Sequence, residues 1–256
     1  MLVYSFGQMD PILFRIHFGW TTANYTSILG SIYLATILRS LLLSGSATLV
    51  CLLIGYPVAL AISRQPKQRQ YVLILAIMLP FWTSFVVRTY AWIDLLSSHG
   101  PIGNLMASLG LGRPAILFTP LSVAIGIAYD YLPLMVLPIY VTLERLDVTL
   151  LDSAADLGAG GWRTLRRVVF PLSLPGVVAG CLLVAIPTLG EYVVPAILGG
   201  GKTLMYGNVV ANQFLETANY PFGSALAIGL LVVLGLGLLL ARAGIARSAR
   251  HAAARA

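Results

Sequence analysis

Stretches of apolar residues about as long as a membrane-spanning helix recur along the sequence, and they constrain the fold more than any other feature. The clearest one, Ser40–Ile62, contains 23 residues and no charged side chain, and ~20 apolar residues are enough to cross the hydrocarbon core of a bilayer. With 58% hydrophobic and only 10% charged residues in a chain of 256, there is more apolar surface than one soluble core can bury. We therefore expect an all-α polytopic membrane protein embedded in a lipid bilayer.

Five transmembrane helices are predicted. They are expected at about 40–62, 71–96, 116–143, 176–198 and 222–241. These spans form a single transmembrane domain over 36–242, which lies between an external N-terminal segment over 1–35 and a tail over 243–256. Prolines inside the spans predict bends and unpaired carbonyl groups; they are Pro57, Pro80, Pro133, Pro138 and Pro187.

The basic residues are distributed unevenly between the two sides of this topology. Eleven of the sixteen Lys and Arg residues fall in the loop over 64–70, the loop over 144–175 and the tail together with Arg242 just before it, and three fall on the opposite side. By the positive-inside rule, the loop over 144–175 and the C-terminus are cytoplasmic and the N-terminus is external. Because membrane orientation explains the net charge of +7, nucleic acid is not an expected partner.

The segment 144–175 is the only long stretch that mixes acidic and basic residues evenly, which predicts a water-facing loop. Asp147 is placed to cap a helix whose small and apolar residues recur at helical spacing, and Gly158 ends that helix. A second helical turn is expected over 162–169, ending at Pro171. The pattern alone leaves two alternatives: a helix that docks on another protein, or an amphipathic helix that rests on the lipid headgroups.

The order of residues in this loop resembles the EAA loop of the membrane subunits of binding-protein-dependent ABC importers. The family pattern is Glu-Ala-Ala, three residues, Gly, nine residues and Ile-x-Leu-Pro; the matching residues are Asp152-Ser153-Ala154, Gly158 and Val168-Val169-Phe170-Pro171. Asp stands for Glu, Ser for the first Ala, Val for Ile and Phe for Leu. The resemblance implies a coupling helix that docks on an ATPase through Asp152, Ser153, Ala154, Ala155, Asp156, Leu157, Gly158 and Pro171.

The same resemblance implies a complete import complex in a bacterial inner membrane. Two permease subunits form the pore, and the partner is expected to be a second, homologous permease. Separate ATPase subunits bind ATP and Mg²⁺, and a periplasmic substrate-binding protein delivers the solute, so this chain is expected to bind no cofactor and to catalyse no reaction. The tract from Ser5 to Tyr33 resembles the external loop between the first two helices of the family's six. The chain therefore resembles the six-helix permease fold without its first helix.

Local sequence motifs are similar to spermidine/putrescine permeases within this family. The matching strings are 80–84, 87–92, 131–138 and 190–195 with 198–200. Permeases for ferric iron, thiamine and opine-like compounds share parts of these strings, so they remain alternative substrates. Ala196 stands where relatives often carry a polar or acidic residue, which weakens the polyamine interpretation.

Four charged residues lie inside the predicted spans: Arg88, Asp94, Asp130 and Glu191. A charge at the bilayer centre costs at least ~2.5 kcal/mol, so these side chains should face the protein interior or a water-filled cavity. Three acids and one base make a net negative interior that suits an ammonium-bearing solute, and neighbouring rings add cation-π contacts. The expected substrate pathway is therefore Arg88, Tyr90, Trp92, Asp94, Asp130, Tyr131, Glu191 and Tyr192. The alternative is that Arg88 pairs with one acid to lock helices together, while Asp94 sits near the outer interface.

No catalytic or metal-binding motif is recognised. Gly201-Lys202-Thr203 ends like a phosphate-binding loop, but Ala196 stands where such a loop needs glycine. Cys51 and Cys181 both fall in apolar spans, which favours packing over a disulfide or a metal site. The rival class, a secondary transporter, predicts repeated halves, and the sequence contains no convincing internal repeat.

Overall fold

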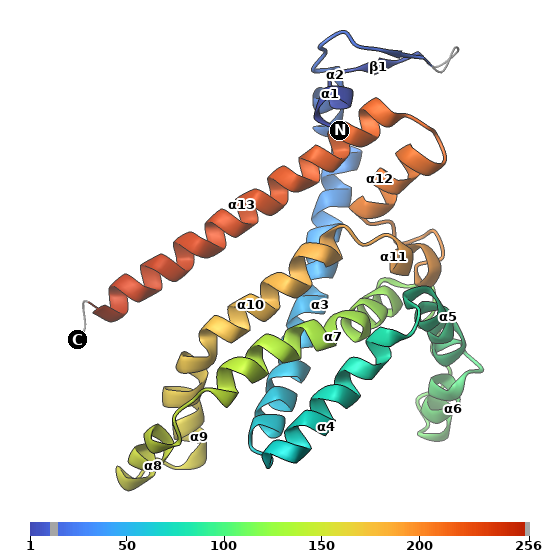
Figure 1. Ribbon diagram of the computed structural model, residues 1–256. Helices are drawn as coiled ribbons and strands as arrows, with labels where there is room; N and C mark the ends of the chain where they lie inside the picture. The colour runs from blue at the N-terminus through green and yellow to red at the C-terminus, as the bar shows by residue number, and fades with distance from the viewer. Residues whose placement is uncertain (11–14, 254–256) are drawn as a thin grey trace. The chain divides into compact units, whose positions relative to one another are not determined.

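The computed structural model describes residues 1–10 and 15–253 of the chain (Figure 1). It contains two compact units, one built from Met1–Leu38 and Met205–Ala256 and the other from Arg39–Leu204. All of the predicted site residues lie in the second unit.

Four helices in the described part of the chain are long and apolar enough to cross a membrane. They are Ile32–Ser63, Pro120–Glu144, Gly161–Leu189 and Tyr220–Gly237. Two further helical segments, Lys67–Trp82 and Phe85–Ser108, pass the same test together but meet at an angle of 92°. Five candidate spans are therefore present if this bent pair counts as one. The second span is not the continuous helix expected over 71–96, and the fourth, expected over 176–198, is wrong at its end because its helix stops at Leu189.

The break in the second span follows from its backbone. Helix α4 (Lys67–Met78) runs into the 3₁₀ turn η1 (Leu79–Trp82), and α5 (Phe85–Leu96) begins beyond it. Pro80 was expected to bend the span, because proline lacks the N–H that an α-helix needs. The change of direction occurs just after it, where Thr83 and Ser84 are extended, with ψ of 155° and 129°.

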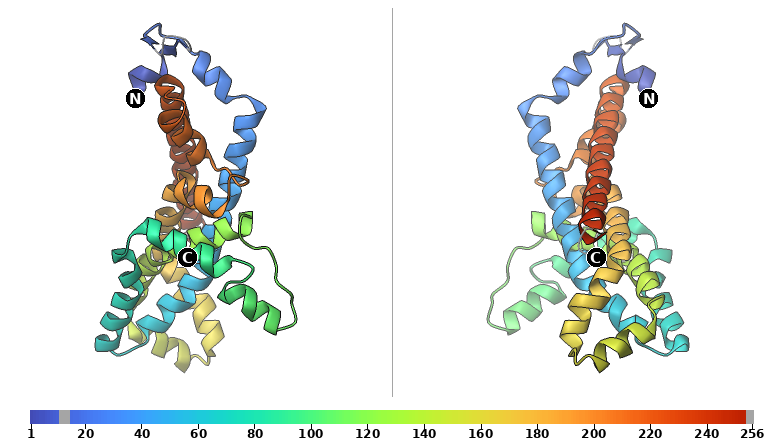
Figure 2. Two further views of the ribbon diagram at one scale, coloured as in Figure 1. Left: turned by 90° about the vertical axis from the view of Figure 1, so that its right-hand side faces the viewer. Right: turned by 90° about the vertical axis from the view of Figure 1, so that its left-hand side faces the viewer.

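The core of the second unit is made by α7 (Pro120–Glu144) and α10 (Phe170–Leu189), which lie side by side in Figures 1 and 2. Helix α3 (Ser31–Ser63) packs against them. Glycine permits the close approach, since a Cβ at Gly180 would lie 2.8 Å from Sδ of Met135 and one at Gly55 would lie 3.0 Å from its Cγ. The fully buried side chains here include Cys51, Ala59, Met135, Val136, Ile139 and Val184.

One boundary of the loop over 144–175 was predicted wrongly. After α8 (Val148–Asp156), helix α9 (Gly161–Thr164) continues through a π-helical turn, η2 (Leu165–Val169), directly into α10, so the helix does not end at Pro171. The N–H of Phe170 donates to the carbonyl of Leu165, five residues earlier. Because a π-helical turn shifts the hydrogen bonds by one residue, it accommodates a proline that a regular α-helix would exclude.

Two shorter helices complete the second unit. Helix α6 (Pro101–Ser108) follows α5, and α11 (Val193–Leu198) follows α10 after a short break. The C-terminus of α11 is fixed to α7, because the carbonyl of Leu198 accepts hydrogen bonds from the N–H of Phe118 at 3.1 Å and the hydroxyl of Ser122 at 2.9 Å. Gly199 ends α11, and Gly200 and Gly201 follow with positive φ, as expected for a helix terminus rather than a phosphate-binding loop.

The first unit contains α1 (Leu2–Ser5), α2 (Ala23–Ile28), α12 (Tyr206–Leu215) and α13 (Tyr220–Ala253). Strands β1 (Gln8–Met9) and β2 (Ile16–His17) pair antiparallel, a small element that was not expected in an all-α chain. The core gathers around Tyr206, whose hydroxyl donates to the carbonyl of Leu226 at 3.0 Å. The predicted tail over 243–256 continues α13 as far as Ala253, and its last three residues lie outside the described part of the chain.

Candidate functional site

Arg88 on α5 and Asp130 on α7 form a buried ion pair in the second unit. The Nε atom of Arg88 lies 3.2 Å from Oδ1 of Asp130, and the two side chains are only 10% and 2% exposed. An unpaired charge in this position would carry a large desolvation penalty, so the pairing makes both charges tolerable. The alternative in which Arg88 pairs with an acid therefore has a geometric basis, and Asp130 is the acid.

Arg88 also contacts the broken span to which it belongs. Its Nη1 donates to the carbonyl of Pro80 at 2.5 Å, and its guanidinium lies 5.4 Å from the ring centre of Phe81 and 5.8 Å from that of Phe85. The guanidinium therefore supplies a donor for a carbonyl at the break. Such compensation is what allows irregular backbone at membrane depth.

Asp130 is the less satisfied partner of the pair. Among the described residues, neither Oδ1 nor Oδ2 accepts a hydrogen bond with acceptable geometry, although the carboxylate is almost fully buried. Buried polar atoms in proteins are nearly always hydrogen-bonded, and an orphan indicates a missing partner such as a water, an ion or a ligand. Asp130 therefore has the capacity to accept from a group that is not part of this unit.

Glu191 has a different environment, in the break between α10 and α11. Its Oε1 accepts from the N–H of Val193 at 2.9 Å and from that of Val194 at 3.3 Å, and its Oε2 accepts from the hydroxyl of Tyr131 at 2.7 Å. A carboxylate at the first N–H groups of a helix satisfies donors that have no partner within the helix. Glu191, only 7% exposed, therefore holds the start of α11 against α7.

The close approach of α11 to α7 depends on Gly126. A Cβ at this position would lie 2.5 Å from Cδ1 of Leu198 and 2.9 Å from Cγ1 of Val194. Gly126 lies one helical turn before Asp130. The absence of a side chain there brings the start of α11, and with it Glu191, close to the buried pair. Sequence reasoning missed this glycine, because nothing in a single sequence separates it from the other 24.

The other predicted pathway residues do not join this cluster. Asp94 is exposed on α5, and Tyr90 and Tyr192 are about half exposed. Trp92 is partly buried and packs edge-on against Tyr129, with ring centres 5.3 Å apart. The structure therefore brings together Arg88, Asp130, Tyr131 and Glu191, and it leaves Tyr90, Trp92, Asp94 and Tyr192 on accessible or peripheral positions of the described chain.

The helix predicted in the loop over 144–175 is α8, and both of its ends were correctly predicted. The carboxylate of Asp147 accepts from the N–H of Thr149 at 2.9 Å. Hydrogen bonds from the backbone and the side chain of Thr149 lower the pKa of Asp147. At the other end, Gly158 has a φ of +72°. The N–H groups of Gly158 and Ala159 donate to the carbonyls of Ala155 and Ala154, at 2.8 and 3.0 Å, which is the Schellman arrangement.

The two neighbouring alanines of α8, Ala154 in the EAA-like motif and Ala155 just after it, differ in exposure. Ala154 is buried, at 9% exposure, and Ala155 is exposed. Among the other predicted docking residues of α8 and its C-cap, Asp152, Ser153, Ala155, Asp156 and Leu157 are exposed. Leu157 is 87% exposed, an unusual environment for leucine at the end of a short helix. Exposed apolar residues rimmed by polar ones are typical of a surface that binds another protein.

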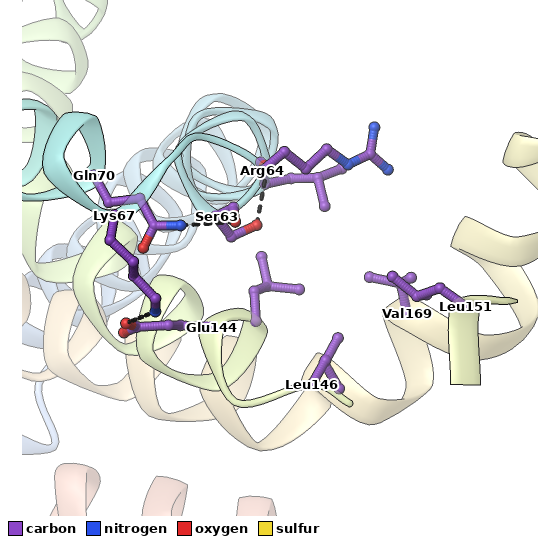
Figure 3. A pocket seen from close by; sticks show the side chains of 10 residues that line it. Ser63, Arg64, Lys67, Gln70, Glu144, Leu146, Leu151 and Val169 are labelled. Carbon is purple, nitrogen blue, oxygen red and sulfur yellow. Dashed lines mark hydrogen bonds and ion pairs between the residues drawn. The ribbon is translucent and has the colours of Figure 1, made fainter. Parts of the chain in front are cut away.

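A pocket of about 230 Å³ lies beside α8 (Figure 3). It is lined by Leu60, Ser63, Arg64, Lys67, Gln70, Leu143, Glu144, Leu146, Leu151 and Val169. Gln70 is buried and joins three segments, since its Nε2 donates to the carbonyls of Ser63 and Gln65 at 3.0 and 2.7 Å and its Oε1 accepts from the hydroxyl of Tyr140 at 2.9 Å. Sequence reasoning did not single out Gln70. A polar residue inside a run of basic loop residues carries no signal of burial.

An ion pair at the rim of the pocket makes a second link between α4 and α7. Nζ of Lys67 lies 2.6 Å from Oε1 of Glu144, as Figure 3 shows. The Lys67 side chain is largely exposed, so the pair contributes little to stability by itself. Together with Gln70, it connects the turn between α3 and α4 to the end of α7, where the loop that carries α8 begins.

Comparison with known proteins identifies the family. A family model described as "Binding-protein-dependent transport system inner membrane component" matches residues 1–251. The chain belongs to this family of permeases. The family consists of multi-pass inner membrane subunits of ABC importers, in which a partner ATPase hydrolyses ATP and a binding protein supplies the solute.

Two curated permeases show how much of the chain the similarity covers. The chain is 44% identical over 239 residues to the spermidine/putrescine transport system permease protein PotB of Haemophilus influenzae, a match that covers 92% of the chain and 83% of the relative. It is 41% identical to the permease of the same name from Escherichia coli, covering 86% of the chain and 81% of the relative. A bacterial ABC transporter involved in alginate import has the same fold, with a TM-score of 0.68 at 19% identity over 88% of this chain and 83% of the other. The permease therefore acts as a transport component and not as an enzyme.

Proposed function

We propose that this permease forms part of the translocation pathway for spermidine and putrescine. The observation that carries the proposal is its 44% and 41% identity to two permeases that are named for these solutes, over at least 86% of the chain. We further propose that the pore is completed by a second, homologous permease. The family supports this arrangement, because its members are components of a multi-subunit transport system.

The electrostatics of the buried cluster support a cationic solute. Asp130 and Glu191 supply two carboxylates, and Arg88 supplies one guanidinium. The cluster therefore has a net negative charge, which favours an ammonium group and disfavours an anion. In this proposal, the more accessible Asp94, Tyr90, Trp92 and Tyr192 line the route to the cluster, where aromatic faces attract an ammonium group through cation-π contacts.

The loop that carries α8 is proposed to dock on the ATPase from the cytoplasm. Its contact surface comprises Asp152, Ser153, Ala155, Asp156 and Leu157, while Ala154, Gly158 and Pro171 shape the helix and its connection to α10. The uneven distribution of Lys and Arg supports a cytoplasmic position for this loop and for the C-terminus. ATP binding by the partner would then move α8 and the helices attached to it.

The experiment that tests this function is uptake into proteoliposomes. The permease is reconstituted with its partner permease, the ATPase and the binding protein, and entry of spermidine and putrescine is measured with and without ATP inside the vesicles. We expect uptake only with ATP and only with the loaded binding protein. Selective uptake of thiamine, ferric iron or an opine-like compound would assign another substrate, and uptake without the ATPase would point to a secondary transporter.

A further inference from the structure

Arg88 connects two parts of the permease that are otherwise separated by a break. Arg88 follows the 92° bend, and its Nη1 donates to the carbonyl of Pro80, which precedes the bend. Its Nε faces Asp130 on α7. The Pro80 carbonyl also accepts from the N–H and the hydroxyl of Thr83. One guanidinium therefore holds the bent segment and a core helix at the same time.

The contact with Asp130 is incomplete for an arginine-carboxylate pair. Such pairs are frequently bidentate, with two parallel N–H groups donating to two oxygens. Here Nη1 is committed to Pro80, and a single Nε–Oδ1 approach of 3.2 Å remains. Oδ2 is buried and has no hydrogen-bond partner in the described part of the chain. A pair that served only to fix the helices would gain from satisfying this oxygen.

The hydrogen bonding of the Glu191 carboxylate, by contrast, is satisfied at both oxygens. Both of its oxygens accept hydrogen bonds from groups of the protein, namely two N–H groups of α11 and the hydroxyl of Tyr131. Of the two buried carboxylates, only Asp130 therefore has an unused acceptor. An ammonium group, with three N–H donors, can approach Oδ2 of Asp130 without breaking the start of α11.

We propose that Arg88 is a resident counter-ion of Asp130, and that an ammonium group of the solute displaces it during transport. The inference rests on the proposed function for the identity of the solute. Displacement exchanges one positive charge for another, so the carboxylate is never left unpaired. The released guanidinium keeps or loses its contact with Pro80, and in either case the ion pair between α5 and α7 is broken near the bend, while the Lys67–Glu144 and Gln70–Tyr140 contacts at the other end of α4 remain. Arrival of the solute in the cluster thus changes how the broken span is held.

The state without solute then has a defined restraint, and its removal has a measurable effect. A tie between α5 and α7 biases the permease toward one conformation, and coupling of this kind typically changes an equilibrium by a factor of 5 to 150. In this proposal the ion pair favours the conformation in which the ATPase is idle. Without the pair the hydrolysing conformation becomes more populated by a factor in this range, so we expect the ATPase of the assembled complex to hydrolyse ATP about tenfold faster in the absence of binding protein.

The decisive variant replaces both charges, Arg88→Met with Asp130→Leu. Apolar residues of similar size commonly substitute for a buried ion pair without loss of stability. We expect this double variant to assemble with the ATPase, to show the raised basal ATPase rate and to lose solute uptake. If it transports spermidine at the parent rate with an unchanged basal rate, the pair only fixes the helices and the proposal is overturned. Arg113→Gln, an exposed arginine in the loop before α7, is the control and should behave like the parent.

A conservative variant gives a second, independent test. Arg88→Lys retains a positive charge that pairs with Asp130, but its one nitrogen cannot occupy both the Nε position beside Asp130 and the Nη1 position beside the Pro80 carbonyl. We expect assembly to be preserved, with a basal ATPase rate between those of the parent and the double variant. A basal rate equal to that of the parent would contradict the proposal, even if the double variant did not assemble.

The basal ATPase rate also separates this proposal from the proposed function. It is measured without any solute, so it does not depend on whether the solute is a polyamine. A parent that fails to import spermidine, together with a double variant whose basal rate is raised, would reject the substrate but retain the counter-ion. A parent that imports spermidine, together with variants whose basal rates are unchanged, would retain the substrate and reject the counter-ion role of Arg88.

Discussion

The hydroxyl of Tyr131 donates to Oε2 of Glu191 at 2.7 Å, and Tyr131 directly follows Asp130 on α7. Two adjacent residues of one helix therefore serve the two buried carboxylates of the cluster in different ways. Tyr131 completes the hydrogen bonding of Glu191, whereas neither oxygen of Asp130 accepts a hydrogen bond from the described residues. This difference makes the roles of the two acids separable by mutation.

We expect Glu191→Gln and Glu191→Ala to differ in stability. Glutamine retains an oxygen that accepts from the N–H groups of α11, whereas alanine leaves those buried donors without a partner, at a cost of about 1–3 kcal/mol. Thermal unfolding of the purified complex should show a lower midpoint for Glu191→Ala than for Glu191→Gln. Equal midpoints would show that Glu191 does not hold the start of α11.

Asp130 should matter more than Glu191 for uptake, although Glu191 matters more for the structure. We expect Asp130→Asn to reduce polyamine uptake more than Glu191→Gln does, because the unused oxygen belongs to Asp130. Initial rates of uptake at several solute concentrations would separate weaker binding from slower transport. A larger defect for Glu191→Gln would assign the solute contact to Glu191.

Docking of the ATPase is best tested at Leu157, because this side chain is almost fully exposed and contributes little to the packing of the permease itself. We expect Leu157→Glu to abolish co-purification of the ATPase from membranes while leaving the thermal stability of the permease unchanged. Leu111→Glu, an exposed leucine in the loop before α7, is the matched control. If the ATPase still co-purifies with Leu157→Glu, the docking surface lies elsewhere. Ala154 is less suitable, because it is buried and a large residue there would disturb α8 itself.

The cap of α8 should make this loop sensitive to acid. The hydrogen bonds to Thr149 lower the pKa of Asp147 in the folded chain below the ordinary value, which is about 3.9. The stabilisation is therefore fully present above the unfolded pKa and is lost as the pH falls through the lower, folded one. Limited proteolysis of the loop at decreasing pH should show α8 opening in this range. Asp147→Asn, which still caps, should remove the pH dependence without opening the helix at neutral pH.

The buried amide of Gln70, at the pocket beside α8, should contribute more to the stability of the permease than the exposed polar residues near it. Gln70→Leu leaves the Ser63 and Gln65 carbonyls and the Tyr140 hydroxyl without this partner. We expect a loss of about 1–3 kcal/mol in stability, measured as a lower unfolding midpoint. Gln68→Leu, an exposed glutamine on the same helix, should have little effect. Similar midpoints for both variants would contradict a role for Gln70 in joining α3, α4 and α7.

Local signals explain what the sequence could predict. Asp147 and Gly158 bound α8 because capping and a positive φ depend on single residues and their immediate neighbours. The apolar runs likewise predict the spans, since a bilayer requires length and composition rather than specific contacts. Pro171 led to the wrong prediction of a helix end, because the π-helical turn that accommodates it depends on hydrogen bonds that cannot be inferred from residue types.

Contacts between distant segments could not be predicted in the same way. The sequence allows Arg88 to pair with any of three acids, and only the packing of α5 on α7 selects Asp130. The capping role of Glu191 becomes evident only when α11 is seen to begin two residues later. Similarly, the choice between Ala154 and Ala155 as the exposed residue depends on how α8 lies against the rest of its unit.

The continuity of α9, η2 and α10 has a mechanical consequence. Because the helix does not stop at Pro171, the 29 residues from Gly161 to Leu189 form one rod, about 43 Å long at 1.5 Å per residue. A rigid rod acts as a lever: a tilt of roughly 10° about one end of a helix of this length moves the other end by roughly 7 Å. Glu191 lies two residues beyond the far end of this rod. A rotation applied at the loop that carries α8 is therefore transmitted along one continuous helix to the break that holds Glu191, the residue that positions α11.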